Sequence, residues 1–600
     1  NNWWGTNNSP VSRLLNLGSG ITCDKWLILN VTANPLTILP GYSSTITADL
    51  THNSNGENTL SQGNVPNGIN VSFEYNPTNL GSLNLVYNTI YMSMATTTFN
   101  SGNETGIVNI KTIIDNQTIN TTIKIQTDVY VSPSGSDITG DGFENNPYLT
   151  IGKAIIESCW SSRIHVANGI YYEHLTINKS ISIIGENKDN TIIDGNSTSQ
   201  VVTINDYLLI NLSNLTIRNG KAIDGVSGNN GDSNNQGDIG GTGVNGGGIY
   251  NYNSILNLTD CIITGNSAGN GGIGGNGGDG YFVGSTSHSA GDGGTGGNGG
   301  NGGGIYNCGQ LTINNCTINN NHAGNGGNGG EGGYGPYIYH RDSIFGSYHY
   351  HYCFAGDGGY GGLGGNGGGI YNEGQLTIIN CIINSNHAGN GGNGGEGGYA
   401  YYSSYRGYGG AGRPGGNGGA IYSKANSLRI YYNSLKLHIF NSTLNNNYAG
   451  NGGNAGYSYG NYNSNGGLGG NGGGIFTEWD LIISNSNVLG NNVGRGGYTT
   501  NYYQKLPGYG GFIYTNFIAG NYYDMWGLFQ KYCQPTIEIH YNRIIDNILP
   551  NYSFSGNIDI YNNGNLPINT QNNWWGSNDD PTNRVSGTVN ATSWLVLNTN

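Results

Sequence analysis

The sequence predicts an all-β protein in which a small β-sandwich is followed by a long parallel β-solenoid with glycine-rich insertions. Three observations predict this fold. Short runs rich in Ile, Val and Thr recur along most of the chain, Asn and Gly occupy the bends between them, and a Gly-Gly-Gly-Ile-Tyr-Asn motif repeats through its middle. A chain of 600 residues is also too long for one ordinary core.

The composition limits the classes of function. Charged residues make up only 9%, where about 25% is usual, so the chain resembles neither a typical enzyme nor a charged disordered tail. The net charge is -14 with 21 Lys and Arg and no basic cluster, which argues against nucleic-acid binding. No apolar run is long enough to span a membrane. The acidic, lysine-poor composition suits the outside of a cell, and we expect the export signal and anchor to lie outside this sequence.

One motif pair recurs at the two ends of the sequence. Asn1–Gly5 reads NNWWG and returns at Asn572–Gly576, and Trp26–Asn30 (WLILN) returns at Trp594–Asn598 (WLVLN). We therefore expect one full period of a longer tandem array. The predicted parts are the C-terminal cap of a preceding solenoid (1–25), a spacer domain (26–127), the solenoid (128–576, with insertions at about 220–515) and a linker with the next spacer's first strand (577–600).

The spacer region shows alternating apolar and polar residues. Turn-rich stretches separate the runs every ten or so residues, which is typical of a β-sandwich. The runs are 27–32, 44–50, 69–73, 106–111 and 121–125. No Cys…Trp…Cys pattern occurs, which excludes the antibody subtype.

The pattern changes near Val129. A strand at 129–131, a Gly- and Asp-containing loop and a short helix at 149–157 are expected to cap the open end of the solenoid. Coils of three- to five-residue strands follow, with Asn and Gly at bends that require positive φ. Examples are 163–166, 175–177, 181–185, 191–194, 201–204 and 215–218.

The GGGIYN motif lies at Gly246–Asn251, Gly302–Asn307 and Gly367–Asn372, with weaker copies at 418–422 and 472–476. Aligning the segments after it predicts two columns of stacked residues about 4.8 Å apart. They are Cys261, Cys316, Cys381, Ser442 and Ser486, and Ser267, His322, His387, Tyr448 and Asn492. The three cysteines allow either one disulfide or a reduced ladder pointing inward.

Long excursions with the period GGx interrupt the central coils, for example 269–278 with its return at 293–300. A three-residue repeat suits a polyglycine-II-like conformation. Coils at a fixed spacing would bring successive excursions together, so we expect a layer of stacked hairpins; a flexible loop is the alternative.

Tyrosines concentrate at the hairpin tips. An exposed Tyr offers a large contact area at low entropic cost, so the tips are candidate ligand-binding residues, with mutual packing as the alternative. The candidates are Tyr281, Tyr334, Tyr337, Tyr339, Tyr401, Tyr402, Tyr405, Tyr457, Tyr459 and Tyr502.

Candidate metal-binding and catalytic residues are few. His349, His351 and Cys353 share one face of an extended segment and could hold Zn or Cu, although an aromatic loop explains them as well. Segment 274–282 fits a calcium nonapeptide once, through Asp279, whereas calcium solenoids need tandem copies. A β-solenoid enzyme would need clustered carboxylates; Asp260, Asp480, Asp546 and Asp559 fall at different coil positions.

Glycosylation sequons are frequent. They begin at Asn30, Asn70, Asn103, Asn116, Asn120, Asn178, Asn196, Asn211, Asn214, Asn257, Asn315, Asn441, Asn551 and Asn590. Chance in an Asn-, Ser- and Thr-rich sequence is the alternative.

These motifs resemble known families. The coils resemble the right-handed parallel β-helix superfamily, GGGIYN resembles the repeats of polymorphic outer-membrane proteins, and 26–127 resembles an invasin-type immunoglobulin-like domain. The assembly from YVSPSGSD at 130–137 to NNWWGSND at 572–579 is similar to adhesin-like surface proteins of methanogenic archaea. The resemblance implies an all-β fold: a right-handed parallel β-helix with stacked polyglycine-II-like hairpins, preceded by an immunoglobulin-like β-sandwich.

The resemblance also implies an extracellular adhesin or stalk and brings no catalytic residues or cofactors. The expected partners are cell-surface glycans or another cell's surface, neighbouring repeats of the chain and lateral copies, without nucleic acid. A structural subunit of an extracellular filament or sheath is the alternative, and a polysaccharide-processing enzyme comes third.

Overall fold

A computed structural model describes most of the chain. The described residues are 2–10, 24–283, 286–336, 354–400, 406–424, 436–459, 463–501, 503–516, 520–523, 530–533, 536–547 and 558–597. They form two compact units, one of Asn1–Val131, Gly135–Leu149 and Lys153–His165, the other of Ser132–Ser134, Thr150–Gly152 and Val166–Asn600. The domain boundary placed at residue 127 stays a prediction.

The first unit contains the expected β-sandwich. One sheet has the strand order β1-β3-β7-β5 and the other β2-β9-β8-β4-β6. The strands are β1 (Leu27–Asn34), β2 (Thr37–Ile38), β3 (Ser43–Asn53), β4 (Asn70–Asn76), β5 (Gly81–Leu83), β6 (Tyr87–Thr89), β7 (Met94–Ser101), β8 (Gly106–Ile114) and β9 (Gln117–Ile125), with short 3-10 turns at Leu60–Gln62 and Thr78–Leu80.

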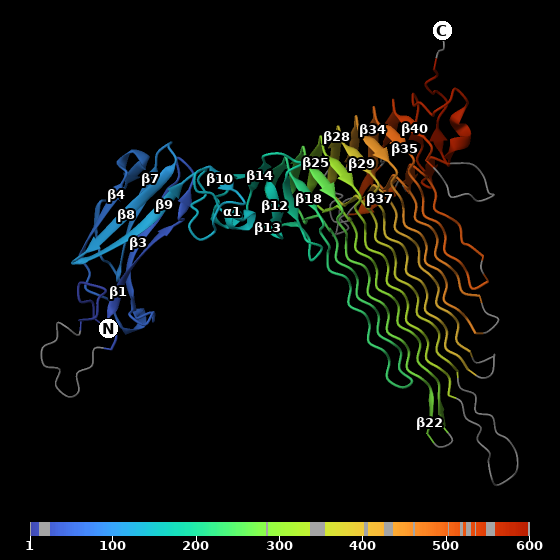
Figure 1. Cartoon of the computed structure of the whole chain (residues 1–600), viewed down its shortest axis with the longest axis horizontal. Coiled ribbons are helices and arrows are strands. Elements are labelled where there is room, and N and C mark those ends of the chain that lie inside the picture. Colours follow the sequence, from blue (N-terminus) through green and yellow to red (C-terminus); the bar gives the residue numbers. More distant parts are fainter. Residues whose placement is uncertain are drawn as a thin grey trace. The chain divides into compact units, whose positions relative to one another are not determined.

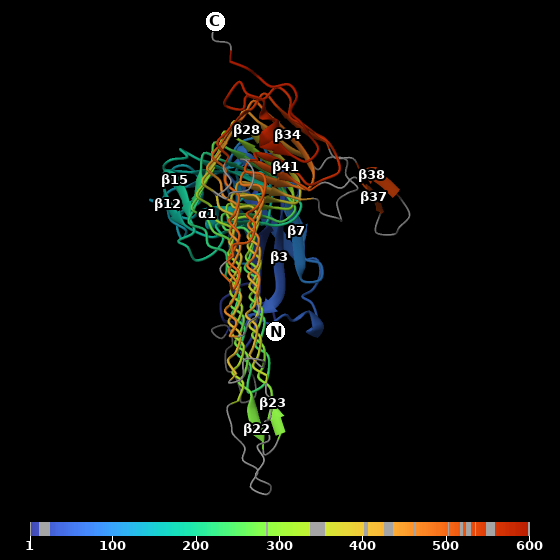
Figure 2. The ribbon, with the colours of Figure 1, turned by 90° about the vertical axis from the view of Figure 1, so that its right-hand side faces the viewer.

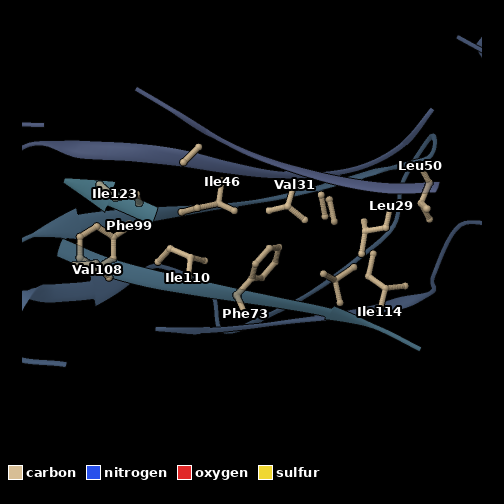
Figure 3. Packing of buried hydrophobic residues seen from close by; sticks show 14 of the residues in the cluster. Leu29, Val31, Ile46, Leu50, Phe73, Phe99, Val108, Ile110, Ile114 and Ile123 are labelled. Carbon is tan, nitrogen blue, oxygen red and sulfur yellow. The ribbon is translucent and has the colours of Figure 1, made fainter. Parts of the chain in front are cut away.

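Alternation along these strands builds the sandwich core. In β1, Leu27, Leu29, Val31 and Ala33 are buried, while the residues between them are less buried or exposed. Figure 3 shows side chains of the two sheets, among them Ile46, Phe73 and Phe99, filling the space between the layers. The period-2 pattern of the sequence therefore becomes an apolar inner face and a polar outer face.

The predicted cap elements are β10 (Asp128–Val131) and α1 (Ile151–Glu157), and the first predicted coil strand is β11 (Arg163–Val166). Glu173 fixes the start of the helix, because its carboxylate accepts hydrogen bonds from the backbone amides of Ile151 and Gly152, both at 2.8 Å. A carboxylate in this place satisfies amides that have no partner within a helix.

The second unit is a right-handed parallel β-helix in which each coil gives one strand to each of three sheets. Sheet 1 holds β13 (Leu175–Ile177), β16 (Val202–Ile204), β19 (Ile249–Asn251), β24 (Ile305–Asn307), β27 (Ile370–Asn372), β30 (Ile421–Ser423), β33 (Ile475–Thr477), β36 (Ile513–Thr515), β41 (Ile560–Asn562) and β43 (Val585–Ser586). Sheet 2 continues through β14 (Ile181–Gly185), β17 (Leu209–Ser213), β20 (Ile255–Thr259), β25 (Gln310–Asn314), β28 (Gln375–Ile379), β31 (Lys436–Phe440), β34 (Asp480–Ser484), β39 (Ile537–His540), β42 (Ile568–Asn569) and β44 (Val589–Asn590). Sheet 3 holds β12 (Gly169–Tyr172), β15 (Thr191–Asp194), β18 (Thr216–Arg218), β21 (Ile262–Thr264), β26 (Thr317–Asn319), β29 (Ile382–Asn384), β32 (Thr443–Asn445), β35 (Asn487–Leu489) and β40 (Arg543–Ile545).

The repeated motif fixes the register of successive coils. Ile305, Tyr306 and Asn307 pair in parallel with Ile370, Tyr371 and Asn372, residue for residue. The bends after the sheet 2 and sheet 3 strands take positive φ, as at Asn315 (φ 54) and Asn320 (φ 53), where an asparagine costs less than most residues. Like residues therefore lie above one another along the β-helix.

The glycine-rich excursions are arms that project from one side of the β-helix in parallel rows (Figure 1). Each arm has an outgoing strand and a return strand, as in 269–278 and 291–300. Gly271 donates its amide to Asn325 O on the next outgoing strand, and Gly272 donates to Gly241 O on the preceding return strand, both at 2.8 Å. This repeated network forms the stacked hairpin layer that the GGx period predicted.

Figure 2 shows the layer edge-on, with outgoing and return strands lying side by side. The pair of glycines in each triplet faces the neighbouring backbones; a Cβ on Gly327 would meet Gly272 O. Two short hairpins lie outside the three sheets: β22 (Tyr281–Val283) pairs with β23 (Thr286–His288), and β37 (Gly520–Tyr523) pairs with β38 (Gln530–Cys533).

The two copies of the terminal motif make matching contacts, each within its own unit. Leu27 N donates to Asn2 O at 3.0 Å, and Leu595 N donates to Asn573 O at 3.0 Å. Trp26 Nε1 donates to Asn7 O at 2.9 Å, and Trp594 Nε1 donates to Asn578 O at 3.3 Å. The sequence repeat is thus also a structural repeat.

Candidate binding surface

The predicted cysteine column stacks inside the β-helix. Cys261 N lies 3.2 Å from Cys316 Sγ, and Cys316 N lies 3.5 Å from Cys381 Sγ. All three are free thiols in the structure, which corresponds to the reduced ladder. Ser442 and Ser486 continue the column, since Cys381 N donates to Ser442 Oγ at 3.0 Å.

Sequence reasoning missed the polar ladders in the interior. Asn386 is fully buried, and its Nδ2 donates to Ile318 O (2.9 Å) and to Asn447 Oδ1 (3.0 Å). Its Oδ1 accepts from the backbone amide and side chain of Asn321. The same column contains Asn266, Asn321, Asn386, Asn447, Asn491 and Asn547. The signal was the invariant asparagine immediately before the Ser267–His322–His387 column.

An aromatic stack follows sheet 1. Tyr306 and Tyr371 lie with ring centroids 4.9 Å apart at an interplanar angle of 4°. The stack continues through Tyr250, Tyr422, Phe476, Tyr514 and Tyr561. Burial raises the pKa of Tyr422 well above its ordinary value. These rings pack against each other, so they stabilise the coil stack rather than offer their faces to a ligand.

The described tip tyrosines lie next to the turns of the arms, and Tyr281 begins β22, which Figure 1 shows at the end of one arm. Tyr334 is 55% exposed and Tyr457 is 53% exposed. Tyr281 stacks on His288 across the β22–β23 hairpin with centroids 4.6 Å apart. These residues offer rings and hydroxyl groups at the edge of the layer.

Tyr459 is more enclosed than the other tips. It packs edge-on against Tyr399 at 5.5 Å and Tyr457 at 5.1 Å. Arg406 donates to Tyr459 O at 2.7 Å and lies over the Tyr399 ring at 4.7 Å. Mutual packing, the alternative weighed for the tips, therefore describes this residue, whereas Tyr334 remains open.

Several candidates lie outside the described residues. They are the tip residues Tyr337, Tyr339, Tyr401, Tyr402, Tyr405 and Tyr502, the metal candidates His349, His351 and Cys353, and the sequon at Asn551. Across the described ranges no cluster of three or more His, Cys, Asp or Glu could hold a metal.

The described sequons lie mostly on the surface. Exposed asparagines are Asn30, Asn70, Asn103, Asn116, Asn120, Asn178, Asn196, Asn315, Asn441 and Asn590, and Asn211, Asn214 and Asn257 are partly buried. Asn257 Nδ2 donates to Asn211 Oδ1 at 2.9 Å, so these two amides already belong to an outer ladder. Whether any of them is modified stays a prediction.

The carboxylates weighed for catalysis have structural partners. Asp559 is fully buried and paired with Arg584 at 2.6 Å, and Asp480 accepts from Thr536 N at 2.6 Å. Asp260 accepts from Asn315 Nδ2, and Asp279, the calcium candidate, accepts from Tyr334 N at 2.8 Å. Asp546 lines a small hollow beside Asp579 and Asp580.

Together these features define the class: a parallel β-helix protein that carries an immunoglobulin-like β-sandwich. No family model and no curated protein matches the sequence. Among the described residues, no helix combines the length and apolar character needed to cross a membrane.

Distant likenesses exist among solved structures. The Yersinia pseudotuberculosis adhesin InvE shares 23% identity over 16% of this chain and 26% of that one, with a TM-score of 0.13. The D00-D0 domain of intimin shares 18% identity over 18% of this chain and 52% of that one, with a TM-score of 0.14. Pectin methylesterase PemA from Erwinia chrysanthemi shares 13% sequence identity over 60% of this chain and 89% of that one, with a TM-score of 0.23. The chain thus spans about a quarter of InvE and about half of the intimin fragment.

Proposed function

We propose that this chain is a segment of an extracellular, tandemly repeated cell-surface adhesin that binds through the tips of its glycine arms. The observation that carries the proposal is a stiff layer that holds exposed Tyr334 and Tyr457 at its outer edge. Exposed tyrosines on a fixed framework lose little entropy on contact, as in antibody binding loops. The resemblance to adhesin-like surface proteins of methanogenic archaea supports the same role.

The matching contacts of the two terminal motifs support the tandem arrangement. The Asn2–Leu27 and Asn573–Leu595 hydrogen bonds would join the end of one β-helix to the first strand of the next sandwich. Repetition of such a joint gives a surface protein length and stiffness. The partners proposed for the tips are glycans or proteins on another cell's surface.

Replacing the tips tests the adhesive role. The test variant carries Tyr281→Ser, Tyr334→Ser and Tyr457→Ser, and the control variant carries Tyr207→Ser, since Tyr207 is 83% exposed and lies outside the arms. Retention of protein-coated beads on whole cells and on glycan arrays should fall on the order of tenfold or more for the test variant alone. Unchanged retention with unchanged circular dichroism would rule out the tips.

A filament or sheath subunit is the second candidate, and one face of the arm layer favours it. On the return strands, Leu363, Leu468 and Leu506 are 44%, 50% and 58% exposed, and they lie in one column of neighbouring arms with Pro414 between them. Two more exposed aromatic residues lie on these return strands: Tyr360, three residues before Leu363, and Tyr408, six residues before Pro414. An apolar row of this kind suits lateral packing of copies.

Electron microscopy of the purified chain separates the two candidates. Isolated particles across a concentration series favour the adhesin, whereas ordered lateral arrays that disappear with Leu363→Asn and Leu468→Asn favour the filament. The tip variants serve as controls, because they leave the return face unchanged.

A further inference from the structure

A polar groove runs along the β-helix where the outgoing strands leave sheet 3. Its volume is about 1090 Å³. Small side chains form its floor, one on each successive coil: Ala268, Ala323, Ala388, Ala449 and Val493, all nearly fully buried. The groove therefore extends across five successive coils and has small apolar residues at its base.

One wall is the column that contains His322, His387 and Tyr448. The two imidazoles stack with centroids 4.9 Å apart, and His387 lies 4.6 Å from Tyr448. Within the described part of the chain, no residue forms a hydrogen bond with either imidazole. The ring faces are used by the stack, so their polar edges are what a ligand in the groove can reach.

The groove is also lined by a ladder of asparagines at the first x position of four successive arms: Asn270, Asn325, Asn390 and Asn451. Asn325 Oδ1 accepts from Asn390 N, and Asn390 Oδ1 accepts from Asn451 N, both at 2.8 Å. Each side-chain oxygen is thus committed to the next arm. The Nδ2 groups of Asn325, Asn390 and Asn451 have no partner among the described residues, and all three side chains are exposed.

The groove therefore repeats the same set of groups on the three coils that carry His322, His387 and Tyr448: an amide donor, an imidazole or phenol edge, and a small apolar floor. Hydroxyl groups can accept from the amides and donate to a neutral imidazole, and the C–H face of a sugar ring suits an alanine floor. A pyranose unit is about as long as one coil is high, which is about 4.8 Å. Charge is confined to the ends, where Lys221 is paired with Asp224 and Arg495 is exposed.

We propose that this groove binds an extended, neutral glycan chain lying along the axis of the β-helix, one sugar ring to a coil. The site is separate from the arm tips and adds a second, linear mode of carbohydrate recognition to the adhesion proposed above. Recognition rests on the row of Asn Nδ2 donors, which lines the same groove as His322 and His387.

The substitution Asn390→Asp tests the role of the Asn390 Nδ2 group as a hydrogen-bond donor. The aspartate keeps an oxygen for Asn451 N, as Asp224 does for Asn270 N at 2.6 Å, but removes the Nδ2 group from the groove. The matched control is Asn366→Asp. Asn366 holds the equivalent place in a return-strand ladder, where its Oδ1 accepts from Asn417 N at 2.8 Å, and it does not line the groove.

The full chain is titrated by calorimetry with cello-, manno- and xylo-oligosaccharides, from disaccharide to octasaccharide. Oligogalacturonates are titrated in parallel as an acidic series. Affinity for one neutral series should rise with length and level off when the coils are filled. Asn390→Asp should weaken it by on the order of five- to tenfold, and Asn366→Asp should leave it unchanged.

Three outcomes overturn the proposal: no binding by any neutral series, affinity that does not depend on length, or equal losses in the two variants. Binding by oligogalacturonates alone also overturns it, because the groove would then recognise charge. Ala388→Leu, which narrows the floor, provides a second test if its circular dichroism is native. The tip variant Tyr334→Ser should retain groove binding, so failure of the groove and failure of the adhesive tips are distinguishable.

Discussion

Asn7 and Asn578 hold the same two hydrogen bonds at opposite ends of the chain. Asn7 accepts from Leu29 N at 2.6 Å and donates to Leu29 O at 2.9 Å; Asn578 accepts from Leu597 N at 2.7 Å and donates to Leu597 O at 3.1 Å. One side-chain amide thus holds the WLILN segment in the first copy, where it begins β1, and the WLVLN segment in the second copy, where residues 595–597 form no strand. We interpret this clamp as a unit of the joint between successive repeats.

The clamp predicts a local loss of stability in Asn7→Ala. Both hydrogen bonds are lost and the Leu29 amide is left to water, at a cost of about 1–3 kcal/mol. Hydrogen exchange should show faster exchange at Leu29 and along β1. Asn8→Ala is the control because Asn8 is exposed and, among the residues that the structure describes, only its backbone amide forms a hydrogen bond; an equal effect there would contradict the assignment.

The interior asparagine ladder predicts a large effect at Asn386 and a small one two residues earlier. Asn386→Leu removes the acceptor of the buried Asn321 amide and the side-chain donor to Ile318 O and Asn447 Oδ1, and it should cost at least about 3 kcal/mol in urea unfolding. Asn384→Leu should be neutral or stabilising, since Asn384 Oδ1 is buried without a partner and Leu489 occupies the same column. Similar losses for both variants would show that the ladder adds nothing specific.

The arm layer predicts that glycine position matters more than composition. Gly327→Ala places a Cβ against Gly272 O and should separate the neighbouring strands. Asn328→Asp, on the outer surface of the same arm, keeps an oxygen that can accept from Asn393 N and should be tolerated. Limited proteolysis followed by mass spectrometry should detect new cleavage between residues 323 and 366 in the first variant only. Cleavage of the unmodified arm at the same rate would indicate that the layer is not packed.

The stacked imidazoles predict a loss of stability in acid. Burial, with a smaller contribution from His322, lowers the pKa of His387 to about 4. Because the pKa is lower in the folded state than the usual value of about 6.5, its stabilising contribution is complete above that value and is lost as the pH falls towards 4. The drop in melting temperature between pH 7 and pH 4.5 should therefore be smaller in His387→Tyr, which copies Tyr448, and an unchanged drop would contradict the shift.

Alignment of the repeated segments correctly predicted which residues share a column. Cys261, Cys316 and Cys381 stack inward as expected, and His322 meets His387. The GGx period likewise predicted the stacked arms. These features follow from translational repetition, because a residue that recurs once per coil must lie above its copy.

The polar networks could not be read in the same way. Asn384 and Asn386 have similar neighbours in sequence, yet only Asn386 joins the buried ladder. The direction of a side chain at a bend depends on the local backbone conformation, and a shift of one residue turns it to the other side. The groove was missed for the same reason. The His322 column lies at a bend of the coils and the Asn325 ladder lies in the arms, and the repeat pattern of the sequence does not show that the two line one groove.

The sequence by itself determined the repeat, the strand-and-bend period of the coils and the glycine triplets of the arms, because these depend on residue type and spacing along the chain. Only the tertiary structure decided which amides are satisfied and which remain open. In the arms, Asn390 Oδ1 accepts a hydrogen bond from the next outgoing strand, whereas Asn390 Nδ2 has no partner among the described residues. That division depends on where the neighbouring backbone lies, and the spacing of residues within one coil carries no information about it.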